Sequence, residues 1–192
     1  MKHLNLTPKE FCSATDACQE GREFAEKYST MAEVWDACPR ADWMLWILIA
    51  IDAPINDKTE RLFAVWCVRD TPMHDGRTTG ALLTDPRSIA ALEVAERFAH
   101  GDATTEELAA ARAAARAAAW AAAGVAASAA ASAAAWAAAW DEAWAAVRDA
   151  ARAAARAAAG AAAGAAAWDA AGAAQANQFR TIVSNPFKGG AA

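Results

Sequence analysis

Between Leu108 and Gly172, nearly every residue is alanine except at every fourth position. We call these fourth positions the lattice. Alanine is the strongest helix former and a period near four is helical, so the pattern predicts helix in this region. The lattice residues are Leu108, Arg112, Arg116, Trp120, Gly124, Ser128, Ser132, Trp136, Trp140, Trp144, Arg148, Arg152, Arg156, Gly160, Gly164, Trp168 and Gly172.

The lattice cannot lie along one face of a helix. A helix turns by about 100° per residue, so each four-residue step overshoots one turn by roughly 40°. Three consecutive positions therefore form a small facet, and successive facets meet different neighbours. An unbroken helix over residues 105–180 would be roughly 110 Å long, so we expect breaks. The expected places are near Gly124, near Asp141 and within Gly160 to Gly164.

Before the lattice, apolar residues recur at helical spacing in several short segments. Thr7 with Glu10, and Thr104 with Glu107, are capping boxes that predict helix starts. We expect Ile89, Leu92, Ala95 and Phe98 to face inward, and the helix over 41–52 to be the most buried. The predicted helices cover 8–17, 16 or 17–28, 30–37, 41–52, 58–68 and 86–98, and the alanine-rich segment ends around 178–183.

These patterns predict an all-α fold, in which short N-terminal helices pack with long alanine-rich helices as a bundle or a helical hairpin. We divide the chain into a short-helix region (1–103), an alanine-rich helical region (104–184) and a flexible tail (185–192). Small lattice residues such as Gly160 and Gly164 let helix backbones approach closely. That approach serves either packing within one subunit or self-association, and exposed alanine facets favour a homo-oligomer.

Charge is distributed unevenly along the chain of 192 residues. The formal net charge is -5, but residues 1–107 hold 11 Lys and Arg against 19 Asp and Glu, whereas residues 108–192 hold 7 against 4. The basic half either attracts the acidic half or faces an anionic ligand. A sequence pI near 5.2 and the lack of a Lys-rich stripe argue against binding of duplex DNA.

Targeting and metal signals are weak. The N-terminus has no apolar stretch, and the most apolar run, 43–51, is too short to span a bilayer. We therefore expect a soluble cytoplasmic protein with no membrane association. The cysteines, Cys12, Cys18, Cys38 and Cys67, form no Cys-x-x-Cys pair, so we predict buried free thiols, no metal and no cofactor.

Arginine and tryptophan facets are the first candidate binding site. Bases stack on Trp, and phosphates accept paired hydrogen bonds from Arg, so the combination suits a nucleotide-like ligand. The alternative interpretation is that Trp fills the core and Arg pairs with Asp or Glu. The candidate ligand-binding residues are Arg112, Arg116, Trp120, Trp136, Trp140, Trp144, Arg148, Arg152 and Arg156.

The second candidate is the polar connection from Arg69 to Arg87. His74 beside Asp75 could act as a general base, and Arg77 could hold an anion. No nucleophile motif, phosphate loop or metal-ligand spacing accompanies them, so the alternative is a helix-connecting loop with local turn hydrogen bonds. We predict no catalytic residue.

Three features taken together resemble a group of alanine-rich phage and bacterial proteins. They are the segment Val34-Trp35-Asp36-Ala37-Cys38-Pro39-Arg40-Ala41-Asp42-Trp43-Met44-Leu45-Trp46, the helix from Asp85-Pro86-Arg87 to Ala95-Glu96-Arg97-Phe98-Ala99, and the alanine lattice. This resemblance covers nearly the whole chain and transfers no activity to a residue. The later part is also faintly similar to helical immunity proteins, but lacks the regularly spaced His of that group.

The resulting expectation is a non-enzymatic protein that binds a small anionic, nucleotide-derived signal. A phage counter-defence sponge would act in this way, and such a protein would work in the host cytoplasm. The alternative is an inhibitor or immunity factor that binds a protein through its acidic N-terminal half.

Overall fold

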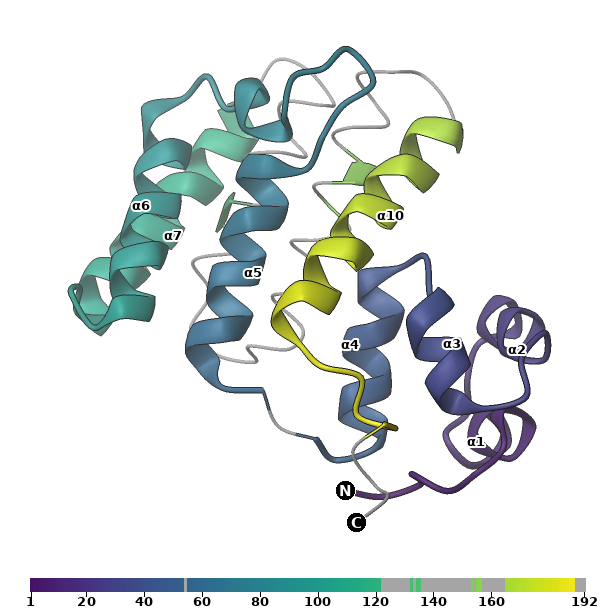
Figure 1. Ribbon diagram of the computed structural model, residues 1–192. Coiled ribbons are helices and arrows are strands. Elements are labelled where there is room, and N and C mark those ends of the chain that lie inside the picture. The colour runs from purple at the N-terminus through teal and green to yellow at the C-terminus, as the bar shows by residue number, and fades with distance from the viewer. Residues whose placement is uncertain are drawn as a thin grey trace. The chain divides into compact units, whose positions relative to one another are not determined.

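The computed structural model describes residues 1–53, 55–121, 132, 134–135, 153, 155–156 and 165–188. Regular structure in these residues is helical (Figure 1). The exception is one antiparallel bridge between Pro72 and Thr78. The predicted all-α fold class is confirmed. The helices are α1 (Pro8–Ala14), α2 (Gln19–Ala25), α3 (Met31–Ala37), α4 (Ala41–Ala50), α5 (Asp57–Asp70), the 3-10 helix η1 (Thr79–Leu82), α6 (Pro86–His100), α7 (Thr105–Ala121) and α10 (Ala165–Ile182).

The alanine lattice is helical wherever the structure describes it. Residues 108–121, 132, 134–135, 153, 155–156 and 165–172 are all in helical conformation. The three expected break points, near Gly124, near Asp141 and within Gly160 to Gly164, lie outside the described residues.

The chain packs as two compact units. The first unit contains residues 1–54 and 176–192, and the second contains residues 55–175. Helix α10 contributes to both, since the boundary falls between Gln175 and Ala176. The sequence-based boundary between residues 103 and 104 lies inside the second unit, in the turn that joins α6 to α7.

In the first unit, aromatic rings fill the space between short helices. Phe11 of α1 contacts Trp46 of α4 edge to face at 6.1 Å between ring centroids. Trp35 of α3 meets Phe179 of α10, also at 6.1 Å, and both rings are fully buried. Edge-to-face and tilted ring pairs add to the energy of burial, so these contacts join the first helices to the last one.

Helix α4, which was expected to be the most buried, is buried along most of its length. Met44, Leu45 and Leu48 are at most 2% exposed, whereas Trp43 and Trp46 are half-buried. The indole rings lie where α4 meets α1 and α2, because their polar N–H edge tolerates partial exposure better than the aliphatic side chains do.

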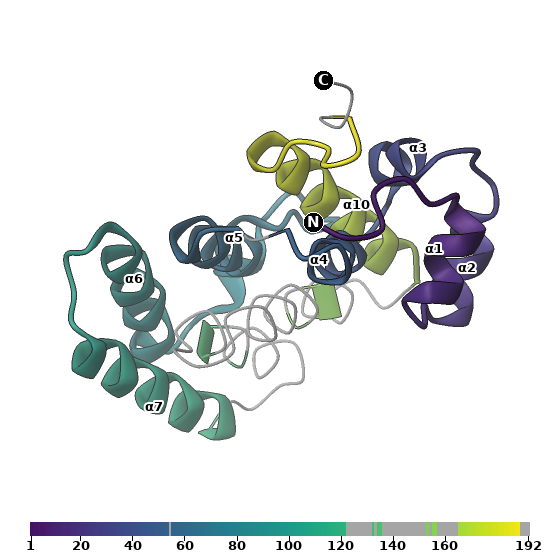
Figure 2. The same ribbon diagram turned by 90° about the horizontal axis from the view of Figure 1, so that it is seen from below.

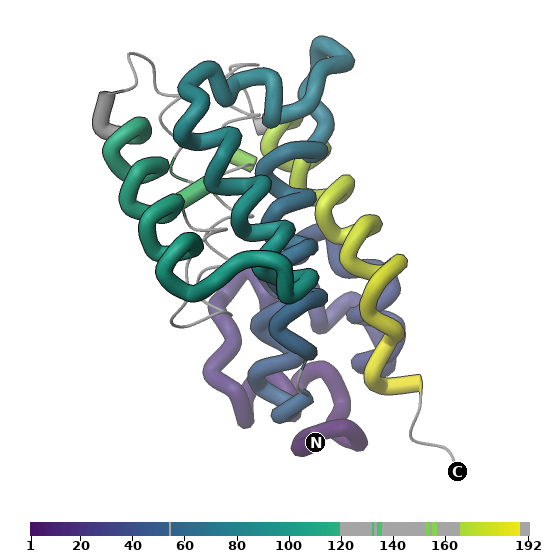
Figure 3. The backbone as a smooth tube through the Cα atoms, turned by 90° about the vertical axis from the view of Figure 1, so that its left-hand side faces the viewer, coloured from purple at the N-terminus to yellow at the C-terminus, as the bar shows by residue number. Residues whose placement is uncertain are grey.

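In the second unit, α6 packs against α5 and forms a hairpin with α7 (Figures 2 and 3). Gly101 ends α6 with a left-handed φ of 85°. The N–H groups of Gly101 and Asp102 bond to the carbonyls of Phe98 and Arg97, which is a Schellman motif. Thr104 and Glu107 then exchange capping hydrogen bonds, so the predicted start of α7 is confirmed.

The predicted inward face of α6 is partly wrong. Ile89 is 43% exposed, whereas Ser88 and Ala91 are fully buried beside Leu92 and Ala95. Small residues allow the close approach of α5 and α7, and the bulky Ile89 would hold them apart.

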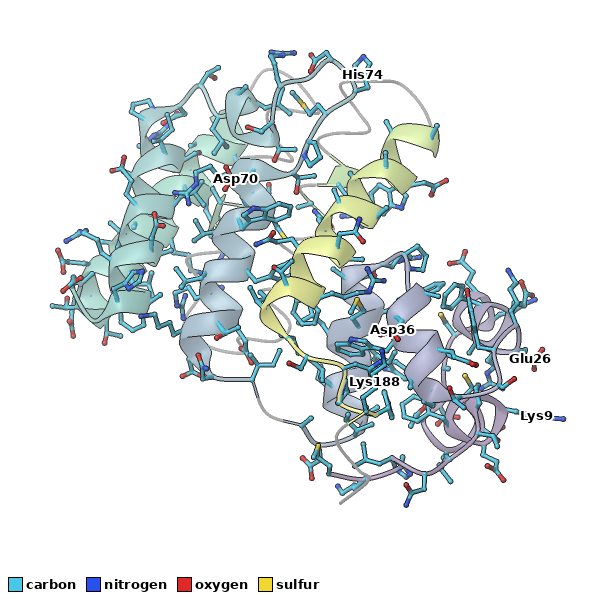
Figure 4. The ribbon with its side chains drawn as sticks, viewed as in Figure 1. Lys9, Glu26, Asp36, Asp70, His74 and Lys188 are labelled. Atoms are coloured by element: carbon cyan, nitrogen blue, oxygen red, sulfur yellow. The ribbon has the colours of Figure 1, made fainter. Side chains whose placement is uncertain are left out.

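The end of the chain is fixed to the first unit. Helix α10 ends at Ile182, within the predicted range. Asn185 donates to the carbonyl of Ala32 and to Asp36, and Lys188 pairs with Asp36 at 2.7 Å (Figure 4). Residues 185–188 of the segment expected to be a flexible tail are therefore anchored on α3.

Among the described residues, no helix is both long and apolar enough to cross a bilayer.

Candidate functional site

Helix α7 shows how the lattice rotates. Its first lattice residue, Leu108, is fully buried, the next, Arg112, is half-buried, and the third, Arg116, is exposed. The buried face continues instead through Ala115 and Ala118, at most 1% exposed. This progression is the expected result of a roughly 40° overshoot per step, which moves successive lattice residues out of the interface. The lattice thus brings Arg side chains to the surface of α7.

Arg112 and Arg116 are neighbours on one edge of α7. Four-residue spacing places their side chains on adjacent turns, where two like charges weaken a helix by a few tenths of a kcal/mol, about 0.2–0.5. Within the described residues, neither guanidinium forms an ion pair or a hydrogen bond with a carboxylate. Glu107 is the nearest acid before Arg112 on α7. Its carboxylate already accepts a hydrogen bond from the Thr104 N–H and forms an ion pair with Arg97. An anion from outside the chain would relieve this repulsion.

Several arginines outside the lattice have carboxylate partners, whereas Arg22 and Arg180 donate to backbone carbonyls. Arg69 binds Glu96 at 2.9 Å, Arg77 binds Asp75 at 2.7 Å, and Arg87 binds Asp85 at 2.6 Å. The Arg87 hydrogen bonds lower the pKa of Asp85 to about 2. Arg156, the third described lattice arginine, is helical and exposed and has no carboxylate partner in the part of the chain that the structure covers.

The remaining predicted site residues cannot be placed beside these three. Trp136, Trp140, Trp144, Arg148 and Arg152 lie outside the described residues, and Trp120 is placed only as a position near the end of α7. Whether the aromatic and basic facets form one surface stays a prediction.

Buried hydrogen bonds attach the polar connection that follows α5 to the end of that helix. The hydroxyls of Thr71 and Thr79 are fully buried and donate to the carbonyls of Cys67 and Val68. Gln175 of α10 donates to the Thr71 hydroxyl at 3.1 Å. Gly80 lies so close to α5 that a Cβ there would stand 2.7 Å from the Arg69 carbonyl oxygen. These contacts support the interpretation as a structural connection.

Among the described residues, His74 has no partner that could orient it as a general base. It is exposed at the tip of the connection, pointing away from the helices (Figure 4). Asp75 does not orient the imidazole, because its carboxylate accepts hydrogen bonds from the side chain and backbone of Arg77, which lower the pKa of Asp75. This geometry gives no support to a His–Asp catalytic pair.

The thiols are mostly inert. Cys12, Cys38 and Cys67 are buried, and burial raises the pKa of Cys38 to about 11. Cys18 differs from the prediction because it is exposed; its sulfur accepts the N–H of Gly21 and caps α2. The described residues contain no cluster of His, Cys, Asp and Glu that could hold a metal ion.

The sequence did not lead us to expect that two neighbouring charged residues of α5 are buried. Glu60 is 2% exposed and Arg61 is 7% exposed. The guanidinium of Arg61 lies over the Phe98 ring at 5.0 Å. The helical period does contain a signal for Glu60, since Glu60, Ala64 and Cys67 recur at spacings of four and three and all are buried.

Protein-family models, curated protein sequences and solved structures provide no match to this chain.

Proposed function

We propose that the chain is a non-enzymatic binding protein that captures a small anionic, nucleotide-derived ligand through the arginine and tryptophan facets of its lattice. The proposal extends to a role as a counter-defence sponge of phage, which acts by holding a signal rather than by converting it. The observation that supports it best is the pair Arg112 and Arg116, adjacent on α7 and without a carboxylate partner among the described residues.

The charge pattern supports an anionic ligand rather than a neutral one. Guanidinium groups donate paired hydrogen bonds to phosphate oxygens, and these charge-assisted bonds are stronger than neutral ones. Helix α7 holds its two arginines on a regular element, so little conformational freedom of the backbone is lost on binding. The tryptophan facet would add stacking with a base, which is a prediction for residues beyond the described part.

Isothermal titration calorimetry with a panel of cyclic and linear nucleotides tests this function. We expect at least one nucleotide to bind with defined stoichiometry, and its affinity to fall as salt is raised, because exposed charge pairs are screened. Absence of binding by every nucleotide in the panel, at low salt and at protein concentrations that would detect weak affinity, would contradict the proposal.

Self-association is part of the proposal. Glycine and serine positions of the lattice would let two copies approach through helix backbones. Analytical ultracentrifugation of the full chain measures self-association directly. A monomer at all concentrations would contradict self-association but would leave the proposal of ligand binding unchanged.

A second function, binding of a basic protein partner, is favoured by one observation in the first unit. Helix α2 and the residue after it expose Glu20, Glu23 and Glu26. A stoichiometric protein partner that is lost when Glu23 and Glu26 are changed to Lys would favour an inhibitor or immunity factor over a nucleotide sponge.

A further inference from the structure

The first turn of α5 buries a carboxylic acid, Glu60. Glu60 is 2% exposed, and its Oε2 atom has no hydrogen-bond partner in the described part of the chain. A buried carboxylate without a partner costs free energy, whereas the protonated form is neutral and much cheaper to bury. The folded second unit is therefore more stable when the Glu60 side chain is protonated than when it is ionised.

The charged groups around Glu60 do not remove this cost. Asp57, one turn earlier on α5, is acidic and repels a second negative charge. Burial and Asp57 together raise the pKa of Glu60 to about 7, and the opposing attraction of Arg61 is smaller. Arg61 lies over Phe98 of α6, and α6 shields it further from solvent.

Elements packed against α5 supply no other described charge to Glu60. On α6, Glu96 is paired with Arg69 and Arg97 with Glu107. The other charged or titratable residues of α6, Arg87, Glu93 and His100, are exposed. The 3-10 helix η1, Thr79–Leu82, contains no titratable residue, and Asp169, the charged residue of α10 within the second unit, is exposed.

We propose that Glu60 is a proton-sensitive switch of the second unit: protonated, it lets the first turn of α5 pack closely, and ionised, it loosens that turn. The switch operates near neutral pH. Its sign follows from linkage, because a group whose pKa is raised in the folded state stabilises the fold at low pH and loses that contribution as pH rises. The contribution is complete below the unfolded value, near 4.5, and lost as pH rises through about 7.

The test compares wild type with Glu60→Gln, which keeps the shape of the side chain but cannot ionise. Hydrogen exchange across residues 57–64 reports opening of the first turns of α5. Between pH 5.5 and 8.5, we expect the opening equilibrium of wild type to rise by about tenfold or more relative to the variant. Normalising to the variant removes the intrinsic pH dependence of exchange, which both proteins share.

The matched control is Glu93→Gln, which removes an exposed glutamate from α6. It should follow the wild-type profile. Parallel profiles of wild type and Glu60→Gln would overturn the proposal. If Glu60→Gln does not fold, carbon-13 NMR titration of the Glu60 carboxyl in wild type decides the matter: a midpoint near the ordinary glutamate value of about 4.3 would overturn the switch.

Discussion

At the scale of single residues, close backbone contacts set narrow limits on side-chain size. Gly80 is the clearest case, because a Cβ would stand 2.7 Å from the Arg69 carbonyl oxygen. The neighbouring Thr79 is fully buried and hydrogen-bonded to the end of α5. Neither the backbone of α5 nor that of η1 can move without breaking these contacts.

We predict that Gly80→Ala lowers the free energy of unfolding by about 1–3 kcal/mol, because the methyl group forces backbone displacement. Urea denaturation measures the change. Gly21→Ala is the matched control, since its Cβ would meet only the Cys18 sulfur at 3.4 Å and alanine favours helix. A Gly80→Ala protein as stable as wild type would show that η1 is not tightly packed on α5.

Local residue signals could be read from the sequence, and distant pairs could not. Thr104 and Glu107 are three residues apart, so one segment contains the whole capping box. Gln175 and Thr71 are separated by 104 residues, and nothing in either segment identifies the other. Glu60 was missed because charge is a strong signal for exposure, although its helical register matches that of buried residues.

At the scale of elements, the C-terminal part of α10 holds α3. Arg180 donates to the backbone carbonyls of Trp35 and Cys38, at and just after the end of α3. Carbonyls at a helix C-terminus lack hydrogen-bond donors within the helix and carry partial negative charge. A guanidinium there supplies the missing donors and a compensating positive charge. Lys188 and Asn185 extend this contact along the same helix.

We predict that Arg180→Ala costs about 1–3 kcal/mol of stability, because half-buried carbonyl groups lose charge-assisted donors. Lys188→Ala is the comparison, since its ion pair with Asp36 is solvent-exposed and worth about 1 kcal/mol or less. Thermal unfolding of the two variants measures the difference. Equal effects would mean that Arg180 contributes only a surface charge.

Helix positions were predicted better than helix faces. Capping residues and proline gave the starts of α1, α6 and α7 correctly, while α5 begins one residue earlier and α3 one residue later than expected. The buried face of α6 was misassigned because size, not hydrophobicity alone, decides which side a close neighbour can approach. Ile89 satisfies the hydrophobic pattern, yet Ser88 is the residue that fits the interface.

At the scale of the whole molecule, the chain forms two units that no local signal marks. The first unit combines residues 1–54 with 176–192, so the two ends of the sequence share one core. Trp35 and Phe179, for example, are buried against each other. Alanine-rich sequence predicted helices, but alanine side chains specify partners weakly because they bury little apolar area.

The central claim is that lattice arginines on α7 bind an anion. It is tested most directly by calorimetry of the double variant Arg112→Ala and Arg116→Ala, with the nucleotide that binds wild type most tightly. The control, Arg77→Ala with Arg87→Ala, removes the same charge from arginines that already have carboxylate partners. We predict at least about a tenfold loss of affinity in the lattice variant and little change in the control, from loss of two charge-assisted contacts. Equal affinities in the two variants would contradict the account.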